Sequence, residues 1–252
     1  MSGAAAVLAK PLIEARALTK RFQGLVSVHK VSFSIAENEI LGLIGPNGAG
    51  KTTLVNMMSG TLKPNDGDLL FEGERINDLP PYRRAHLGIA RTFQVMKPFH
   101  GMSVLENVTV GALFGRDGGD KAMVRARDVA REWIAFTGLG RRMDARADAL
   151  GGPDRKRPEF AKALAMRPKL LLLDEVMAGL NHVEVDEVIE LIRKIRDSGM
   201  TLLVIEHVVK AIRSLSDRVM VLHHGEKIAE GDPARVLADP RVVEAYLGKR
   251  RA

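Results

Sequence analysis

Short apolar runs and helix-spaced apolar positions take turns along most of the chain, and this alternation predicts an α/β fold. The apolar runs typical of strands cover residues 12–17, 31–35, 39–44, 69–71, 89–93, 169–173, 201–205 and 218–222. Helical spacing or helix-start signals mark residues 53–59, 80–88, 121–136, 185–195, 208–214 and, as two short helices, 233–247. The run 169–173 is almost wholly apolar, as expected for a strand covered on both faces of a parallel sheet.

The middle of the chain has a different, mainly helical pattern. Ser103 followed by Glu106 is typical of a capping box, and an amphipathic helix follows a glycine-rich break at 115–120. Helices inserted between two strand-rich halves indicate a subdomain within one domain. We therefore expect one domain over 12–247, with a core at about 12–94 and 167–232, a helical subdomain at about 95–166, a C-terminal helical tail at about 233–247 and a flexible tail at 1–11.

Composition limits the classes of protein to consider. The 252 residues carry a formal charge of +7, which fits either a nucleic-acid partner or a basic surface that faces anionic lipid or keeps the protein soluble. Aromatic residues make up only 4%, which leaves little material for base stacking and favours the second interpretation, with no nucleic-acid partner. The absence of cysteine excludes a disulfide scaffold and favours a cytosolic protein. No apolar stretch approaches the ~20 residues that span a bilayer.

The most specific motif follows the apolar run that ends at Ile44. It fits the phosphate-binding pattern G-x-x-x-x-G-K-[ST] in the expected context between a strand and a helix. Glycines let successive backbone N–H groups point at phosphate oxygens, Lys51 supplies positive charge for the β- and γ-phosphates, and Thr52 offers a hydroxyl to Mg²⁺. The sequence therefore predicts a site for a nucleoside triphosphate formed by Gly45, Pro46, Asn47, Gly48, Ala49, Gly50, Lys51, Thr52 and Thr53.

A second motif is the apolar run that ends in Asp174 and Glu175. A carboxylate at the end of such a strand can hold Mg²⁺ directly or through water, so Asp174 is a candidate metal ligand. Glu175 is a candidate for orienting or deprotonating the attacking water. An apolar strand ending in Asp-Glu is weak evidence alone, but it is strong evidence beside an upstream phosphate-binding loop.

Three further side chains are weaker candidates. Gln94 lies at the end of a predicted strand and could reach the metal or the attacking water, although most glutamines are simply solvated. His207 follows a buried strand and could contact the γ-phosphate or serve as an ordinary residue at a helix start. Phe22 could stack on adenine or pack in the core.

The order and spacing of these positions resemble the ATP-binding-cassette (ABC) ATPases over about residues 12–247. The resemblance rests on Phe22, the loop 45–53, Arg91-Thr92-Phe93-Gln94, Asp174-Glu175, Ala178-Gly179-Leu180-Asn181 and His207. In that family these are the adenine-stacking aromatic, the Walker A loop, the Q-loop, the Walker B strand with its catalytic glutamate, the D-loop and the switch histidine. Three segments, 22–28, 88–94 and 229–248, are similar to the branched-chain amino-acid uptake ATPases.

The resemblance implies a P-loop core with a parallel sheet, an N-terminal antiparallel β subdomain and the helical insertion. It implies ATP hydrolysis with Glu175, His207, Gln94 and Lys51 as catalytic residues, Phe22 and Val28 beside the nucleotide, and Mg²⁺ held by Thr52, Gln94 and Asp174. The implied partners are a second ABC ATPase and two permeases, with a substrate-binding protein engaged indirectly. The implied location is peripheral, on the cytoplasmic face of the inner membrane.

One family motif is altered. Where the family has Leu-Ser-Gly-Gly-Gln, this chain has Leu150-Gly151-Gly152-Pro153-Asp154, which we call the signature-like loop. In the family this loop binds the γ-phosphate held by the opposite subunit. Losing a hydroxyl and an N–H donor, and adding a carboxylate, should weaken that contact by tenfold or more. We therefore expect an asymmetric heterodimer, although Pro153 and Asp154 also suit an ordinary helix start.

A smaller change is Val176 in place of the proline that the family usually has after the catalytic glutamate. It alters local stiffness and removes no chemistry. Two alternatives to a transporter ATPase stay open: a soluble scaffold ATPase of the same superfamily, and a nucleotide-binding regulatory subunit with little hydrolysis.

Overall fold

The computed structural model describes residues 11–92, 98–116, 119 and 122–247. Gln94 and residues 1–10 of the expected flexible tail lie outside these ranges.

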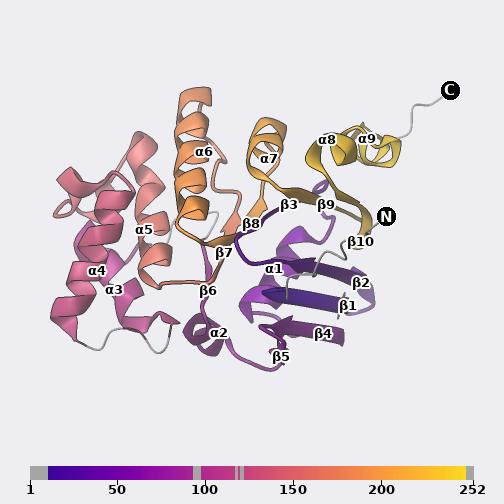
Figure 1. Ribbon diagram of the computed structural model, residues 1–252, viewed down its shortest axis with the longest axis horizontal. Coiled ribbons are helices and arrows are strands. Elements are labelled where there is room, and N and C mark those ends of the chain that lie inside the picture. Colours follow the sequence, from indigo (N-terminus) through magenta and orange to yellow (C-terminus); the bar gives the residue numbers. More distant parts are fainter. Residues whose placement is uncertain (1–10, 93–97, 117–118, 120–121, 248–252) are drawn as a thin grey trace, which may run out of the picture.

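A six-stranded sheet forms the centre of the fold (Figure 1). Its strands, from edge to edge, are β10 (Glu226–Gly231), β9 (Arg218–His223), β3 (Ile40–Ile44), β8 (Thr201–Ile205), β7 (Leu170–Asp174) and β6 (Ile89–Arg91). All neighbours pair in parallel except β9 and β10, which form an antiparallel hairpin. Every residue of β3, β7 and β8 is buried, so their nearly continuous apolar runs are explained by cover on both faces.

A second, antiparallel sheet covers one face of the first. Its strand order is β2 (Leu25–Ile35), β1 (Ile13–Phe22), β4 (Asp66–Phe71) and β5 (Glu74–Arg75). The helix α1 (Lys51–Ser59) lies between the two sheets, and its buried Leu54, Val55, Met57 and Met58 join one hydrophobic cluster with both. This packing fixes the start of α1, and hence the phosphate-binding loop, against a rigid base.

Helices cover the opposite face of the central sheet. They are α5 (Arg157–Ala165), α6 (His182–Asp197), α7 (Val209–Leu215), α8 (Pro233–Leu237) and α9 (Pro240–Leu247). The stripe predicted from helical spacing is confirmed in α6, whose buried side chains are Val185, Val188, Ile189, Ile192 and Ile195. These side chains share a second hydrophobic cluster with the facing residues of the sheet.

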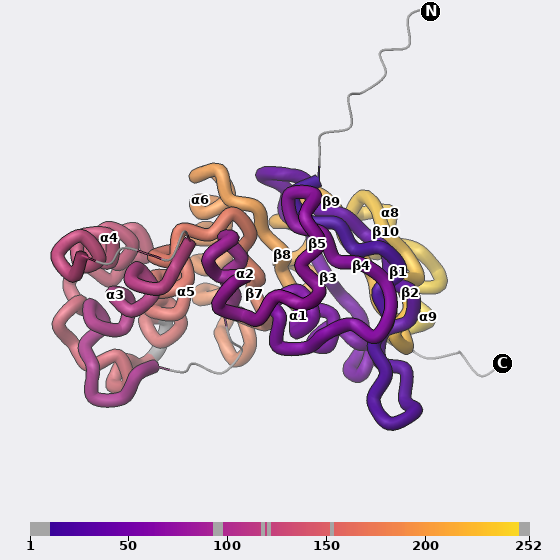
Figure 2. Tube along the Cα trace, turned by 90° about the horizontal axis from the view of Figure 1, so that it is seen from below, coloured from indigo at the N-terminus to yellow at the C-terminus, as the bar shows by residue number. Residues whose placement is uncertain are grey.

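The inserted helices form a third hydrophobic cluster of their own. It joins α3 (Val104–Phe114), α4 (Met123–Phe136) and α5. The capping box that begins α3 is confirmed, with Glu106 N–H donating to Ser103 Oγ at 3.1 Å and Ser103 N–H donating to Glu106 Oε2 at 2.7 Å. Figures 1 and 2 both place these helices at the end of the molecule opposite the antiparallel sheet.

Several elements were not anticipated from the sequence. The hairpin strand β10 begins with two exposed charged residues, Glu226 and Lys227, and its other four residues are only partly buried, so its apolar signal is weak. The strand β1 continues beyond residue 17 through half-buried Lys20 and exposed Arg21, held by pairing with β2. By contrast, the short helix α2 (Pro81–Leu87) was anticipated. It ends at Gly88, as predicted, and the glycine has the left-handed conformation. The expected α/β class with an antiparallel β subdomain is confirmed, whereas the residue boundaries of the subdomains stay a prediction.

Candidate active site

Parallel strands bring the predicted chemical groups to one edge of the central sheet. The phosphate-binding loop follows β3, Asp174 ends β7, and His207 comes two residues after β8. The register pairs Asp174 with Ile205, so β7 and β8 end level, and it pairs Arg91, the last residue of β6, with Leu172, two residues before the end of β7. Ligands of open α/β sheets bind at this edge.

Backbone geometry explains the glycines of the loop. Gly45, Gly48 and Gly50 have φ values of 154°, 78° and 100°, which favour glycine. A Cβ atom at Gly45 would lie 2.2 Å from the Leu222 carbonyl oxygen, and one at Gly50 would lie 2.4 Å from the Ser27 carbonyl oxygen. The loop is therefore wedged between β2 and the end of β9, and only glycine fits at its two ends.

Lys51, the first residue of α1, folds back over the loop. Its Nζ donates to the carbonyl oxygens of Gly45 at 2.6 Å and Pro46 at 3.0 Å. Partial burial lowers the pKa of Lys51, and the negative charges of Glu175 and Asp174 oppose that shift. The ammonium is thus held at the loop by carbonyls and by two carboxylates across the site.

The two threonines of the motif have different surroundings. Thr52 is exposed at the first turn of α1. Thr53 is partly buried, and its hydroxyl lies 2.8 Å from the hydroxyl of Ser27 on β2. The Thr52 hydroxyl is thus available for a ligand, while Thr53 also ties the helix to the antiparallel sheet.

Asp174 is buried and forms an ion pair that the sequence did not reveal. Its Oδ2 accepts from Arg91 Nη2 at 2.6 Å, and the side chains of Arg91 and Asp174 are 11% and 9% exposed. The same guanidinium donates to Asn56 Oδ1 of α1 at 2.6 Å. In the sequence Arg91 stands out only as part of a family segment, and its contact with Asp174 follows from the pairing of β6 with β7.

Glu175 has a backbone conformation that is uncommon for a residue with a side chain. Its φ is +48°, and its N–H donates to the Ile205 carbonyl at 2.9 Å, which extends the β7–β8 pairing by one residue. Its side chain is half-buried, and His207 is exposed. Strained backbone of this kind clusters at functional sites.

The remaining candidates are placed less tightly around the loop. Phe22 ends β1 and is 41% exposed, with Lys20 Nζ 5.4 Å from its ring centroid. Val28 is fully buried in the cluster between the sheets, and its side chain backs onto Gly50. Both stay predictions as nucleotide contacts, and Gln94 lies outside the described residues.

The signature-like loop leads into α5 through a short 3₁₀ turn, η4 (Gly152–Arg155). The Asp154 carboxylate is 3.8 Å from Arg142 Nε and 4.0 Å from Arg157 Nε. These two guanidinium groups offset the negative charge that the sequence led us to expect at this loop.

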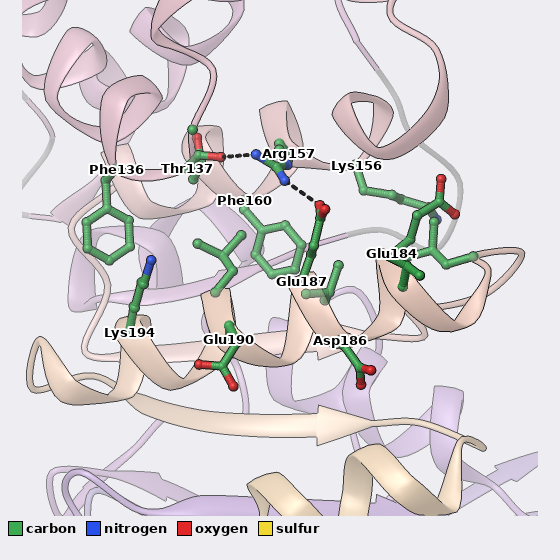
Figure 3. Close-up of a pocket in the computed structure, with 15 residues that line it drawn as sticks. Phe136, Thr137, Lys156, Arg157, Phe160, Glu184, Asp186, Glu187, Glu190 and Lys194 are labelled. Carbon is green, nitrogen blue, oxygen red and sulfur yellow. Dashed lines mark hydrogen bonds and ion pairs between the residues drawn. The ribbon is translucent and has the colours of Figure 1, made fainter.

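A cavity of about 450 Å³ lies beside this loop, between the inserted helices and α6 (Figure 3). Arg157 crosses it, donating to the Thr137 carbonyl at 3.3 Å and to Glu187 Oε2 at 2.7 Å. Arg157 therefore links the inserted helices to the helix that follows the Walker B strand.

Along the described part of the chain, no helix combines the length and the apolar character needed to cross a membrane. A family model described as "ABC transporter" matches residues 28–178, and one described as "Branched-chain amino acid ATP-binding cassette transporter" matches residues 226–252.

Curated relatives match almost the whole chain. The high-affinity branched-chain amino acid transport ATP-binding protein BraF of Pseudomonas aeruginosa is 35% identical over 96% of this chain and 100% of its own length. LivG of Escherichia coli, which has the same description, is 36% identical over the same shares of the two chains. The lipopolysaccharide export system ATP-binding protein LptB of Acidithiobacillus ferridurans is 34% identical over 94% of this chain and 97% of its own.

Solved structures agree with these matches. A nucleotide-free ATP-binding cassette from an ABC transporter superposes with a TM-score of 0.85 at 30% identity, covering 95% of this chain and 100% of that structure. A structure described as the ADP conformation of an ATP-binding cassette of an ABC transporter gives the same TM-score and identity, covering 95% of this chain and 99% of its own. By sequence and by fold the chain belongs to the ABC transporter family, as an ATPase subunit.

Proposed function

We propose that this chain hydrolyses ATP to drive an importer for branched-chain amino acids or related small polar solutes. The observation that carries the ATPase mechanism is the meeting of Lys51, Asp174, Glu175 and His207 at one edge of the central sheet. The importer assignment is supported by the BraF and LivG relatives and by the branched-chain model over residues 226–252. LptB, which belongs to a lipopolysaccharide export system, is almost as similar, so a transport assay has to identify the substrate.

Each side chain has a proposed role in hydrolysis. Loop N–H groups and the start of α1 bind the phosphates, and Lys51 stabilises negative charge that grows on the β–γ bridge. Glu175 orients the attacking water or accepts its proton, and His207 donates to the γ-phosphate. Gln94 would contact the metal or the water.

The donor set fits Mg²⁺. Thr52 and Asp174 offer hydroxyl and carboxylate oxygens, and the described residues contain no cluster of three or more His, Cys, Asp or Glu side chains that would make a dedicated metal cage. Mg²⁺ commonly binds through one or two protein oxygens, with substrate phosphates and water completing the octahedron. When bound, the ion would neutralise charge on the β- and γ-phosphates.

The altered signature-like loop supports pairing with a different ATPase chain. Pro153 has no N–H and Gly151 has no hydroxyl to offer a γ-phosphate. In an ABC heterodimer, the site that uses a partner's signature loop would turn over, while the site that uses residues 150–154 would bind ATP and turn over slowly.

Permease docking is supported by a groove between the core and the inserted helices. The groove has a volume of about 530 Å³, and exposed Tyr82, Phe99 and Phe114 lie along it, respectively 59%, 46% and 64% exposed. Three exposed aromatic side chains along one groove are typical of an interaction surface. A chain docked on permeases here would lie at the cytoplasmic face of the inner membrane, with a substrate-binding protein engaged only through the permeases.

Two measurements test this proposal. Calorimetry with Mg-ATP should give saturable binding to the intact chain, and absence of binding by a folded chain contradicts the nucleotide site. Purification from detergent-solubilised membranes should recover two permeases and a second ATPase. Recovery of soluble partners alone would favour the scaffold ATPase instead.

A regulatory subunit with little hydrolysis is the second candidate, favoured by the same altered loop. Single-turnover hydrolysis with and without the partner ATPase separates the two. A rate that rises at least tenfold when the partner is added supports the motor, and no hydrolysis in either case supports the regulatory subunit.

A further inference from the structure

Glu206 is a buried acid that the proposed hydrolysis mechanism does not use. It stands between Ile205, the last residue of β8, and His207, and it is 1% exposed. Acidic side chains are rarely so completely buried without a specific partner. Glu206 directly precedes His207, the proposed switch histidine, so its contacts bear on the proposed site.

One oxygen of the carboxyl group binds the segment that follows the Walker B strand. Glu206 Oε1 accepts the N–H of Met177 at 2.9 Å. Met177 lies two residues after Glu175 and is itself buried. Glu175 N–H in turn donates to Ile205. The end of β8 therefore accepts two backbone N–H groups of this segment. The Ile205 carbonyl accepts that of Glu175, and the Glu206 side chain accepts that of Met177.

The other oxygen is enclosed and has no hydrogen-bond partner among the residues that the structure describes. Burial, with a smaller contribution from the negative charge of Glu175, raises the pKa of Glu206 to about 7, although the Met177 hydrogen bond, the nearby His207 backbone N–H and the charge of Lys156 oppose the rise. The carboxyl group is therefore poised to gain or lose a proton near neutral pH.

These charged groups come from several elements. Lys156 precedes α5 and lies two residues after the signature-like loop, and its own pKa is lowered mainly by burial. From α9, Tyr246 lines a cavity of about 280 Å³ together with Glu206 and His207. The Tyr246 pKa is raised by burial and lowered in part by a hydrogen bond from the Gly45 backbone. Glu206 thus lies where the switch, the loop after Glu175 and the C-terminal helix meet.

We propose that Glu206 is a positioning residue for ATP hydrolysis, which through its contact with the Met177 N–H fixes Glu175 relative to His207. The inference rests on the proposed roles of Glu175 and His207. When protonated, Glu206 binds Met177 as a neutral acceptor. When ionised, its bond to Met177 is charge-assisted and stronger, and its negative charge makes Glu175 more basic. ATP turnover should therefore rise as pH passes through the ionisation of Glu206.

Two variants separate the hydrogen bond from the charge. Glu206→Gln keeps an acceptor for Met177 but cannot ionise, and Glu206→Ala removes the acceptor. We expect the Ala variant of the full chain to lose about tenfold in single-turnover hydrolysis, with nucleotide affinity within about twofold. The Gln variant should keep most activity at pH 6 and lose the rise in rate near pH 7.

A matched control is Glu39, another buried glutamate that accepts a backbone N–H, from Ala36 at 2.7 Å, at the opposite edge of the sheet. Glu39→Gln should alter stability and leave the pH profile of hydrolysis unchanged. Hydrogen exchange at the Met177 amide gives a readout that does not depend on turnover, and it should be faster in Glu206→Ala and near wild type in Glu206→Gln.

The outcomes are separable. If the Gln variant keeps the wild-type inflection, or if the Ala variant keeps both full turnover and Met177 protection, Glu206 has no positioning role. If Glu175→Gln hydrolyses ATP at the wild-type rate, the proposed function of Glu175 fails first, whatever the Glu206 variants do.

Discussion

The phosphate-binding loop and the signature-like loop, the two segments that we propose contact nucleotide, are built on opposite principles in this chain. The first is fixed by backbone sterics: a Cβ atom on Gly45 or Gly50 would overlap main-chain oxygens of neighbouring strands. The second is a 3₁₀ turn that begins beside a proline, with its carboxylate offset by Arg142 and Arg157. The first loop needs glycine for its shape. In the second loop Pro153 stands where the family motif has a glycine, and proline has no N–H to donate.

This contrast indicates where change is tolerated. The phosphate-binding loop is wedged between both sheets at Gly45 and Gly50, so substitutions at these two glycines would disturb the core as well as the ligand. The signature-like loop lies at the edge of the inserted helices, and its Asp154 carboxylate faces the guanidinium groups of Arg142 and Arg157. We therefore expect substitutions in the signature-like loop to affect folding less and, under the proposed function, to act mainly on contacts with a partner subunit.

The largest expected effect comes from Glu175→Gln on the intact side of the comparison. Removing the base or water-orienting carboxylate should lower single-turnover hydrolysis by about 10²–10³-fold. ATP affinity should stay within about threefold, because the phosphate contacts are unchanged. Glu190→Gln, an exposed acid on α6 paired with Arg193, is the matched control and should leave the rate unchanged. Full activity of the Glu175 variant would disprove the assigned role.

Alanine scanning of two glycines tests whether sterics shape the phosphate-binding loop. Gly50→Ala places a Cβ 2.4 Å from the Ser27 carbonyl at a φ of +100°, so it should lower the free energy of unfolding by about 4 kcal/mol. Gly48→Ala meets no atom within 4 Å and should cost only the left-handed backbone term of about 1 kcal/mol. Denaturant unfolding measures both. Equal losses would mean that the loop is not wedged as described.

Glu206 gives a pH-dependent stability difference between the wild type and Glu206→Gln. Its pKa rises from the model-compound value of 4.5 to about 7 on folding, so the folded state keeps a proton that the unfolded state releases. Wild-type stability should therefore fall as pH rises from about 4.5 to about 7, by about 3 kcal/mol from this group, and then level off. The Gln variant should lack this fall. Parallel stability curves for the two proteins between pH 5 and 8 would contradict the buried titration.

The smallest expected effect concerns the altered loop. Restoring Ser, Gly and Gln at Gly151, Pro153 and Asp154 should raise turnover at the site that uses this loop by about tenfold, because two donors return and one negative charge is lost. Asp154→Gln alone should change stability by at most about 1 kcal/mol, since its ion pairs with Arg142 and Arg157 are long and partly exposed. Turnover of the triple variant equal to that of the wild type would mean that the loop does not limit hydrolysis.

Much of the fold follows from local pattern. The strand β8 and the apolar stripe of α6 were predicted correctly, because their apolar side chains are buried along the whole length of each element. The strand β10 and the outer half of β1 escaped prediction, because these edge segments owe their conformation to a paired neighbour rather than to their own composition.

The candidate site divides along the same line. Lys51, Asp174 and Glu175 belong to short motifs whose spacing along the chain is itself the signal. Arg91 and Glu206 are recognised only when β6, β7 and β8 stand side by side, since their partners lie 83 residues away at Asp174 and 29 residues away at Met177. Contacts at such separation leave no trace in local periodicity.

The pairing of Arg91 with Asp174 has a consequence for the order in which ligands arrive. Because a guanidinium already balances the aspartate, a lone magnesium ion gains little by approaching this corner of the protein. Magnesium would then bind chiefly as a complex with the triphosphate. Raising the magnesium concentration without nucleotide should leave the melting temperature of the protein unchanged.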